Sequence, residues 1–216
     1  MALGKRQIER LYTKRSKHYD ITANLYYLAG FREQKYRKTA VNELGLQPGD
    51  KVVEIGCGTG LNFPLLREKV GPGGRVTGVD LTEAMLEGAR SRIEQNKWKN
   101  VEVVRSDAAG FVFPEKVDGV LSTFAITLVP EYDDVIKAAA AALSPGKRIV
   151  ILDFKKPSHW PQWLLELWLL VTAPFGVTLD LAERHPWESV ERHMRLVRFR
   201  KIYFGLAYIA VGEATM

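Results

Sequence analysis

The fold is constrained most by an alternation that begins near Pro48, in which short apolar runs are followed by longer segments of helical pattern. A short apolar run that is bounded by turn residues is typical of a buried strand. The predicted strands are residues 51–55, 75–80, 101–105, 119–123 and 148–154, and the predicted helices are residues 62–70, 82–96 and 133–143. Strands that alternate with helices favour right-handed crossovers and therefore a mainly parallel sheet.

The end of the chain has a different pattern. Residues 194–203 and 205–212 are two β-rich runs with almost nothing between them, which predicts an antiparallel hairpin at the sheet edge. The predicted fold class is therefore α/β, a Rossmann-like seven-stranded, mainly parallel sheet with an antiparallel C-terminal hairpin. A chain of 216 residues has room for one such domain. We expect this domain to occupy residues 48–216, with residues 1–47 forming a helical lid across the carboxyl edge of the sheet.

The cysteine count and the apolar segments indicate the compartment. Cys57 is the only cysteine, which excludes an intrachain disulfide and fits a reducing cytoplasm. The first residues lack the apolar core of a signal peptide. The most apolar stretch, residues 160–177, contains Glu166 and is broken by Pro161 and Pro174, so it is unsuited to span a bilayer. We expect a cytoplasmic protein that is soluble or attached to the inner face of the membrane.

The net charge of +6 is unevenly distributed along the chain. Residues 1–38 contain ten Lys and Arg residues against three acidic residues, and a second basic cluster lies near the C-terminus. The second cluster consists of Arg192, Arg195, Arg198, Arg200 and Lys201. Such asymmetry points to an anionic partner, either a membrane surface or a nucleic acid. The alternative is a solvated face whose charge only maintains solubility.

The motif with the most chemical information is Val-Val-Glu-Ile-Gly-Cys-Gly-Thr-Gly, which spans residues 52–60. Glycines at every second position allow positive φ angles and let the backbone approach a ligand without a Cβ atom in the way. The turn leaves the first strand at its carboxyl end, where open α/β sheets bind ligands. Its spacing differs from the G-x-G-x-x-G pattern of dinucleotide binding, and Glu54 stands just before it. A carboxylate there is a poor neighbour for a pyrophosphate but suits an aminoacyl ammonium or a sulfonium.

Two more acidic residues follow the next two strands. Asp80 ends the second strand, where a carboxylate can accept hydrogen bonds from both hydroxyls of a ribose, and Asp107 follows the third strand, where it suits an adenine amino group. Each feature alone is weak evidence, because a glycine turn is often only a tight turn and an Asp at a strand end is often an N-cap. At the carboxyl ends of successive strands, however, they together predict a site for a cationic aminoacyl nucleoside.

These motifs, with Leu-Ser-Pro-Gly-Lys before the fifth strand, resemble the successive motifs of class I S-adenosylmethionine-dependent methyltransferases. The resemblance implies that S-adenosylmethionine is the cofactor, that the glycines pack against its methionine portion, and that Asp80 and Asp107 hold its ribose and adenine. Leu81 and Met85 would flank the adenine ring, and Ser122 and its two neighbours would line the methionine and methyl side. The cofactor-binding residues implied in this way are Tyr19, Glu54, Gly56, Cys57, Gly58, Gly60, Asn62, Asp80, Leu81, Met85, Asp107, Ala108, Ser122, Thr123 and Phe124.

The pocket for the methyl acceptor is expected between the N-terminal segment and the insertion after the fifth strand. Tyr19 and Tyr26 are seven residues apart and share a helical face, so both can look toward the cofactor. This segment is similar to the opening of bacterial phospholipid N-methyltransferases and of the related quinone C-methyltransferases, which implies that Tyr19 reaches the methionine end of the cofactor. We predict Tyr19 and His18 as catalytic residues. The alternative is that these tyrosines only pack a helix.

The insertion at residues 157–186 is rich in tryptophan and leucine. Tryptophan with a basic rim is typical of segments that sit among lipid headgroups. Together with the basic N-terminal helix, in which Ile8, Leu11 and Tyr12 recur at helical spacing, the insertion predicts docking on an anionic membrane and a long-chain acceptor. The alternative is a core helix or a contact between subunits. The histidines lack metal-ligand spacing, so no metal site is expected.

The preferred interpretation is an N-methyltransferase acting on the amine headgroup of a phospholipid, with proton removal assisted by Tyr19, His18 or Asp153. The alternative in the same class is a quinone or other hydrophobic small-molecule C- or O-methyltransferase. A nucleic-acid methyltransferase is disfavoured, because few aromatic residues are interleaved with the basic ones. A cofactor-binding regulator without an acceptor pocket is the non-enzymatic alternative.

Overall fold

The structure, a computed structural model, describes residues 32–157, 160–161 and 183–215, together with Gly4, Gln7, Glu9, Arg10, Tyr12 and Thr13. Tyr19, His18 and Tyr26, and most of the Trp-rich insertion, lie outside the described residues. The lid and the membrane-facing insertion therefore stay predictions.

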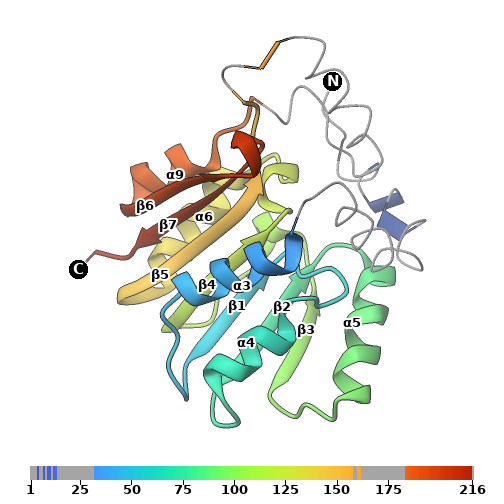
Figure 1. The fold of residues 1–216 in the computed structure, drawn as a ribbon. Coiled ribbons are helices and arrows are strands. Elements are labelled where there is room, and N and C mark those ends of the chain that lie inside the picture. Colours follow the sequence, from blue (N-terminus) through green and yellow to red (C-terminus); the bar gives the residue numbers. More distant parts are fainter. Residues whose placement is uncertain are drawn as a thin grey trace.

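The centre of the molecule is a seven-stranded sheet with the order β3-β2-β1-β4-β5-β7-β6 (Figure 1). The strands are β1 (Lys51–Ile55), β2 (Arg75–Asp80), β3 (Val101–Arg105), β4 (Val117–Thr123), β5 (Leu143–Phe154), β6 (Arg195–Ile202) and β7 (Ala207–Glu213). The first five strands are parallel, and β7 is antiparallel to both β5 and β6. The predicted Rossmann-like fold with an antiparallel C-terminal hairpin is confirmed.

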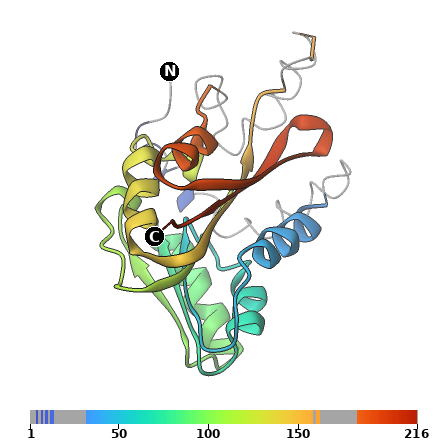
Figure 2. The same ribbon diagram turned by 90° about the vertical axis from the view of Figure 1, so that its left-hand side faces the viewer.

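Helices cover both faces of this sheet and make a three-layer structure (Figure 2). The α-helices are α3 (Glu33–Glu43), α4 (Phe63–Val70), α5 (Glu83–Gln95), α6 (Tyr132–Ala142) and α9 (Pro186–His193). Buried side chains of α3, α4 and α5 share one hydrophobic cluster with alternate strand residues, and α6 and α9 share the other. The inner strands β1, β2, β4 and β7 are apolar and covered on both faces, as expected for the buried strands of such a sheet, whereas the edge strands β3 and β6 are largely exposed.

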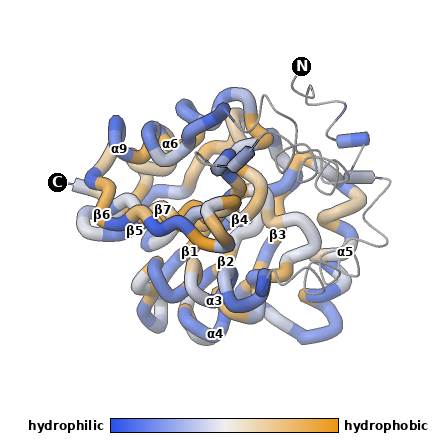
Figure 3. The backbone as a smooth tube through the Cα atoms, turned by 45° about the horizontal axis from the view of Figure 1, so that its top comes forward, coloured by the Kyte–Doolittle hydropathy of each residue, from blue (hydrophilic) through white to orange (hydrophobic). Residues whose placement is uncertain are grey.

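The hydropathy of the chain follows these layers. The central strands are largely hydrophobic, whereas hydrophilic residues mark the outer helices and loops (Figure 3). Among the described residues, no helix is both long enough and apolar enough to cross a bilayer.

Several boundaries differ from the sequence prediction; the fourth strand, for example, begins at Val117 rather than at residue 119. The fifth strand begins at Leu143, before the predicted residue 148, and residues 144–146 lie within β5 as an irregularity. Gly146 has a φ of +76° there, and its backbone N–H donates to the carbonyl of Ala214. In the hairpin, Gly205 belongs to the connection rather than to the last strand, because residues Tyr203–Gly205 form the short 3₁₀ helix η5 between β6 and β7.

The described end of the segment at residues 1–47 is helix α3. It packs on the sheet face that α4 also covers, and Ala40, Val41 and Leu44 are almost completely buried there. This helix is therefore part of the core of the sheet domain. Its first turn lies near the carboxyl end of β4, where Arg37 reaches Thr123.

Candidate functional site

A cavity opens at the carboxyl ends of β1, β2, β3 and β4 and holds about 770 Å³ of space, part of it open to solvent. Its described walls are the glycine turn after β1, the ends of β2 and β3, and the loop after β4. The lining residues are Tyr12, Ile55, Gly56, Gly58, Val79, Asp80, Leu81, Thr82, Met85, Ser106, Asp107, Ala108, Thr123, Phe124, Ala125, Leu128, Val129 and Pro130.

Each glycine of the turn is favoured at its position for a different structural reason. Gly56 has a φ of +68°, and a Cβ atom on it would lie 2.2 Å from the Cβ of Ala125, so the turn and the loop after β4 meet at bare backbone. Gly58 has a φ of +55° and lies beside Met85 at the cavity wall. Gly60 does not line the cavity, because it faces the ring of Phe63, which a Cβ atom would meet at 2.5 Å.

Asp80 fixes the glycine turn to the next strand. One carboxylate oxygen accepts from the backbone N–H of Gly58 at 2.9 Å, and the other accepts from the N–H of Thr82 at 2.9 Å. Burial raises the pKa of this carboxyl, and the two backbone hydrogen bonds oppose that rise. The structure places Asp80 at the cavity wall, and its side chain also supports the turn, which the sequence did not reveal.

The third strand supplies the far wall. Asp107 accepts from the backbone N–H of Ala109 at 3.1 Å and so begins the 3₁₀ helix η2 (Ala108–Gly110). The N-cap interpretation of this Asp is therefore confirmed, and the residue also lines the cavity. Leu81 and Met85 lie on the same wall as apolar surface.

Beneath the glycine turn lies a buried polar network around Glu54. The carboxylate oxygen Oε1 accepts from Asn62 Nδ2 at 2.5 Å, whereas Oε2 is buried without a partner among the described residues. Burial raises the pKa of Glu54 to about 7, while the Asn62 hydrogen bond and the charge of Arg37 lower it. Asn62 is thus not a side-chain cap of α4. Its amide is directed into the network instead.

The network continues to α3 through Thr123. Its hydroxyl oxygen lies 2.9 Å from Asn62 Nδ2 and 2.5 Å from Arg37 Nη1, both of which donate to it. Arg37 is only 6 % exposed, pairs with Glu33, and lies over the ring of Phe124. Sequence reasoning missed Arg37. The available signal was its position one helical turn before the apolar pair Ala40 and Val41.

Several predicted residues lie close to the cavity without lining it. Cys57 and Ser122 are buried, and the hydroxyl of Ser122 donates to the carbonyl of Ile55, which joins β4 to β1. Asp153 is 3 % exposed and accepts from the backbone N–H groups of Thr127 and Phe154, so it supports the loop after β4 and does not face the cavity.

Tyr12 is a lining residue that the sequence assigned to a different role. It was expected on a membrane-facing helix with Ile8 and Leu11, but it forms part of the cavity wall. Arg105 and Glu9 form an ion pair at 3.1 Å, which joins the same part of the chain to the end of β3. Tyr19 and His18 lie outside the described residues, so their predicted roles stay predictions.

The arrangement fits a nucleoside with a cationic aminoacyl arm. The turn leaves its backbone bare, carboxylates stand at the ends of β2 and β3, and a buried carboxylate oxygen of Glu54 lies unpartnered beneath the turn. An unpartnered buried oxygen is costly unless a ligand or a proton compensates it. These residues suit S-adenosylmethionine.

Comparison with known proteins gives a family match. Residues 46–185 match the sequence model described as a methyltransferase domain. The chain is 33% identical over 157 residues to a demethylmenaquinone methyltransferase of Staphylococcus aureus, an alignment that covers 72% of this chain and 63% of that protein. The chain thus spans less than two thirds of the length of this relative.

Solved structures share the fold. An S-adenosylmethionine-dependent methyltransferase of Aquifex aeolicus superposes with a TM-score of 0.61 at 21% identity and covers 82% of this chain and 88% of that one. A phosphoethanolamine N-methyltransferase of Haemonchus contortus, in complex with S-adenosylhomocysteine, gives 0.60 at 21% identity, with 77% of this chain and 38% of that one covered. At these identities the structural likeness shows the fold alone.

Proposed function

We propose that this chain, which belongs to the family of S-adenosylmethionine-dependent methyltransferases, methylates a carbon atom of a hydrophobic aromatic acceptor of the quinol class. The relative named demethylmenaquinone methyltransferase supports this acceptor over the phospholipid headgroup that the sequence favoured. The acceptor identity is the part that goes beyond the family.

The observation that carries the proposal is the composition of the loop after β4. Phe124, Ala125, Leu128, Val129 and Pro130 line the cavity, so this wall is apolar throughout. The charged residues among the described lining residues are Asp80 and Asp107, with no Lys or Arg. A phospholipid headgroup brings a phosphate, which requires a cation or backbone donors, whereas a planar aromatic ring suits this wall.

The proposed role of each residue follows from its position in the cavity. S-adenosylmethionine, when bound, supplies an electrophilic methyl group on a sulfonium. Asp80, Asp107 and the glycine turn bind and orient the nucleoside, and Phe124 and Leu128 keep water from the acceptor side. Orientation and water exclusion are the main contributions that a protein makes to such an in-line transfer.

Attack through carbon also requires proton removal from the acceptor. The acceptor hydroxyl must lose its proton to make the ring carbon nucleophilic, and the methylated carbon must later lose its hydrogen as a proton. Tyr19 and His18 are the proposed groups for this step. Asp153, which the sequence also offered, does not line the cavity and is proposed only to hold the loop after β4.

The test compares two acceptors with one labelled cofactor. The purified chain is incubated with methyl-labelled S-adenosylmethionine and either a short-chain reduced demethylmenaquinone analogue or phosphatidylethanolamine in detergent micelles. We expect label on a ring carbon of the quinol and none in the headgroup, and Tyr19→Phe should reduce turnover by about tenfold or more with little change in cofactor affinity. Label in the headgroup, or no quinol product with the cofactor bound, would refute the acceptor assignment.

A further inference from the structure

The connection between β6 and β7 presents an aromatic ring to solvent from a strained backbone. Phe204 is 84% exposed, and both Tyr203 and Phe204 have left-handed φ angles, of +47° and +54°. Bulky residues rarely adopt this conformation, and glycine or asparagine would occupy it with less strain. An exposed phenylalanine at such a position stabilises neither the core nor the turn, which points to a role outside the folded chain.

This tip lies at the same edge of the sheet as the cavity. Phe154, at the carboxyl end of β5, pairs with Ala207, and the backbone N–H of Lys155 donates to Leu206 just after the tip. The ring of Phe154 lies 4.9 Å from that of Phe124, which lines the cavity. Tyr203 and Tyr36 pack against the same hydrophobic cluster as these two rings. These aromatic side chains thus share one hydrophobic cluster that reaches from the cavity wall to η5.

Two basic residues at the end of β6 precede the exposed ring. Arg200 and Lys201 are exposed just before η5, and neither has an ion-pair partner among the described residues. Lys155 is not part of this exposed charge, because it is only 9% exposed and its ammonium lies over the ring of Trp187, and burial lowers its pKa. Lys156 pairs with Glu183. The basic excess at the tip is therefore not neutralised by the described acidic residues.

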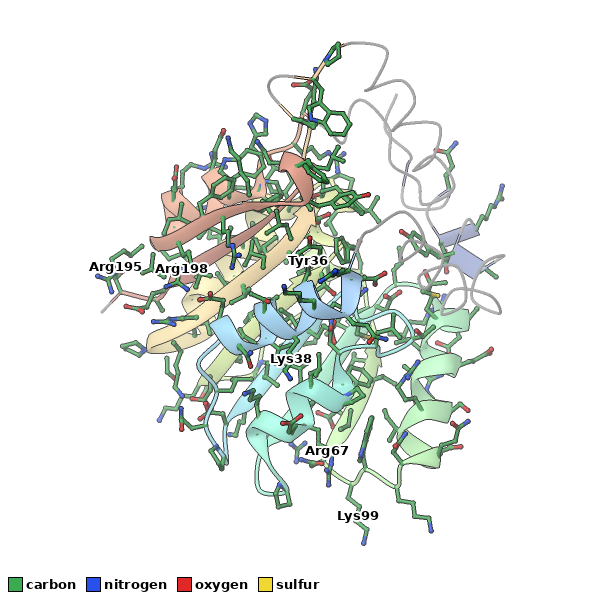
Figure 4. All side chains as sticks on the ribbon, viewed as in Figure 1. Tyr36, Lys38, Arg67, Lys99, Arg195 and Arg198 are labelled. Carbon is green, nitrogen blue, oxygen red and sulfur yellow. The ribbon has the colours of Figure 1, made fainter. Side chains whose placement is uncertain are left out.

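Two other arginines of β6 are neutralised by ion pairs. Arg198 pairs with Glu43 and Arg195 pairs with Glu213. Both lie toward the end of β6 that is remote from η5 (Figure 4). The unpaired charge of this hairpin is thus concentrated at the end that carries Phe204.

We propose that η5, with Phe204 at its apex and the exposed Arg200 and Lys201 just before it, docks the protein on an anionic lipid bilayer. Interfacial attachment combines an exposed aromatic ring, which enters the headgroup region, with neighbouring cations, which attract anionic lipids. The docked tip would place the aromatic path from η5 to Phe124 against the bilayer in which a long-chain acceptor resides. In that respect the inference rests on the proposed function, although docking itself needs no turnover.

Binding is measured directly with vesicles. The intact chain is sedimented with vesicles of phosphatidylcholine alone or of phosphatidylcholine with about 30 mol% phosphatidylglycerol, which makes the membrane clearly anionic. We expect binding only to the anionic vesicles, weakened by salt, and weakened about tenfold by Phe204→Asn. Asn accepts the left-handed backbone, so this variant keeps the fold, and each of Arg200→Gln and Lys201→Gln should weaken binding about fivefold.

Val112 provides the matched control, because it is also apolar and 86% exposed but lies in the loop between β3 and β4. Val112→Asn should bind as the parent does. If Phe204→Asn and Val112→Asn bind alike, or if the parent binds neutral vesicles equally well, the assignment of the tip is wrong. Concentration-dependent self-association that Phe204→Asn abolishes, without vesicle binding, would mean that a second copy of the chain covers the tip instead.

A labelled cysteine reports the environment of the tip itself. Cys57 is the only cysteine and is buried, so Phe204→Cys and Val112→Cys can each be labelled selectively with an environment-sensitive dye. Anionic vesicles should shift the emission of the dye to the blue at position 204 and not at 112. No shift at 204 would overturn the proposal.

Turnover separates this inference from the proposed function. Phe204→Asn should methylate a short-chain quinol in detergent at the rate of the parent and lose activity only toward a long-chain quinol in anionic vesicles. Failure of the parent on both acceptors would refute the quinol assignment while leaving the vesicle result to decide the docking surface.

Discussion

Glu54 and Asp80 are two carboxyls close to the same glycine turn. They differ in how many of their oxygens accept a hydrogen bond. Both oxygens of Asp80 accept backbone N–H groups, so its charge is compensated within the fold. Glu54 has one oxygen on Asn62 and the other buried without a partner among the described residues, and burial raises its pKa to about 7. At neutral pH this side chain is therefore balanced between the protonated and the charged form.

This balance predicts that cofactor binding depends on pH through Glu54. The folded pKa is raised, so the protonated form prevails below pH 7, and only the charged form attracts the cationic arm of the cofactor. Affinity for S-adenosylmethionine should rise by about tenfold between pH 5.5 and 7.5, with proton release. Calorimetry in buffers of different ionisation enthalpy measures both quantities.

Two variants check the assignment to this residue. Glu54→Gln should bind with an affinity that is nearly constant over the same range. Asp80→Ala should lose about 100-fold at every pH, because it removes hydrogen bonds to a charged group without removing the titration. An unchanged pH profile in Glu54→Gln would exclude Glu54 as the titrating group.

At the scale of elements, the cavity exists because the turn after β1 and the loop after β4 touch. β1 and β4 are adjacent parallel strands, so Ile55 pairs with Ser122 and both connections leave at the same edge. Gly56 and Ala125 are the point of contact. Helix α3 adds a further restraint, since the Arg37 side chain donates a hydrogen bond to the hydroxyl of Thr123 at the end of β4. The cavity wall is thus set by contacts between elements that are distant in the sequence.

Gly56→Ala tests this contact. The new Cβ would lie 2.2 Å from the Cβ of Ala125, on a backbone with a φ of +68°, so the loop after β4 must move. We expect a loss of unfolding free energy of about 2–4 kcal/mol and at least about tenfold weaker cofactor binding. Urea denaturation and calorimetry measure the two effects.

Gly73→Ala is the control in the turn before β2. Its Cβ would meet nothing within 4 Å, and its φ lies outside the left-handed region. Its stability should stay within about 0.5 kcal/mol of the parent. Equal stability of the two variants would show that Gly56 is not a tight contact.

Over the whole molecule, buried carboxyls make stability depend on pH in an unusual direction. Burial raises the pKa of Glu54 to about 7 and that of Asp153 to about 6, against ordinary values of 4.5 and 3.8. A raised folded pKa contributes stability that is present below the unfolded pKa and is lost as the pH rises through the folded pKa. Each group should cost on the order of 3 kcal/mol by pH 8.

The free energy of unfolding in the absence of cofactor should therefore be lower at pH 8 than at pH 5. Urea denaturation at the two values measures it, and the double variant Glu54→Gln/Asp153→Asn should lose most of the difference. The pH dependence contributed by Asp133 has the opposite sign, because hydrogen bonds from Ser189 and Arg192 lower its pKa to about 2. The stability that Asp133 contributes is lost only as the pH falls toward that value. A parent that is more stable at pH 8, with an unchanged double variant, would contradict the prediction.

The sequence by itself determined the sheet and one wall of the site. Apolar runs give β1, β2 and β3 with the predicted bounds, because local burial and turn residues specify a strand without reference to the rest of the chain. The same runs place the glycine turn, Asp80 and Asp107 at strand ends, and parallel pairing then brings them to one edge.

Only the tertiary structure decided which side chains reach the cavity and which support it. Asn62 donates to the buried Glu54, Arg37 comes to the site from α3, and Asp153 supports the loop after β4 without lining the cavity. These outcomes depend on contacts between residues separated by up to 86 positions, where burial and the need to pair every polar group override local preference. The exposed tip at Phe204 belongs to the same class, since a run of β-forming residues does not reveal which of its rings the fold leaves uncovered.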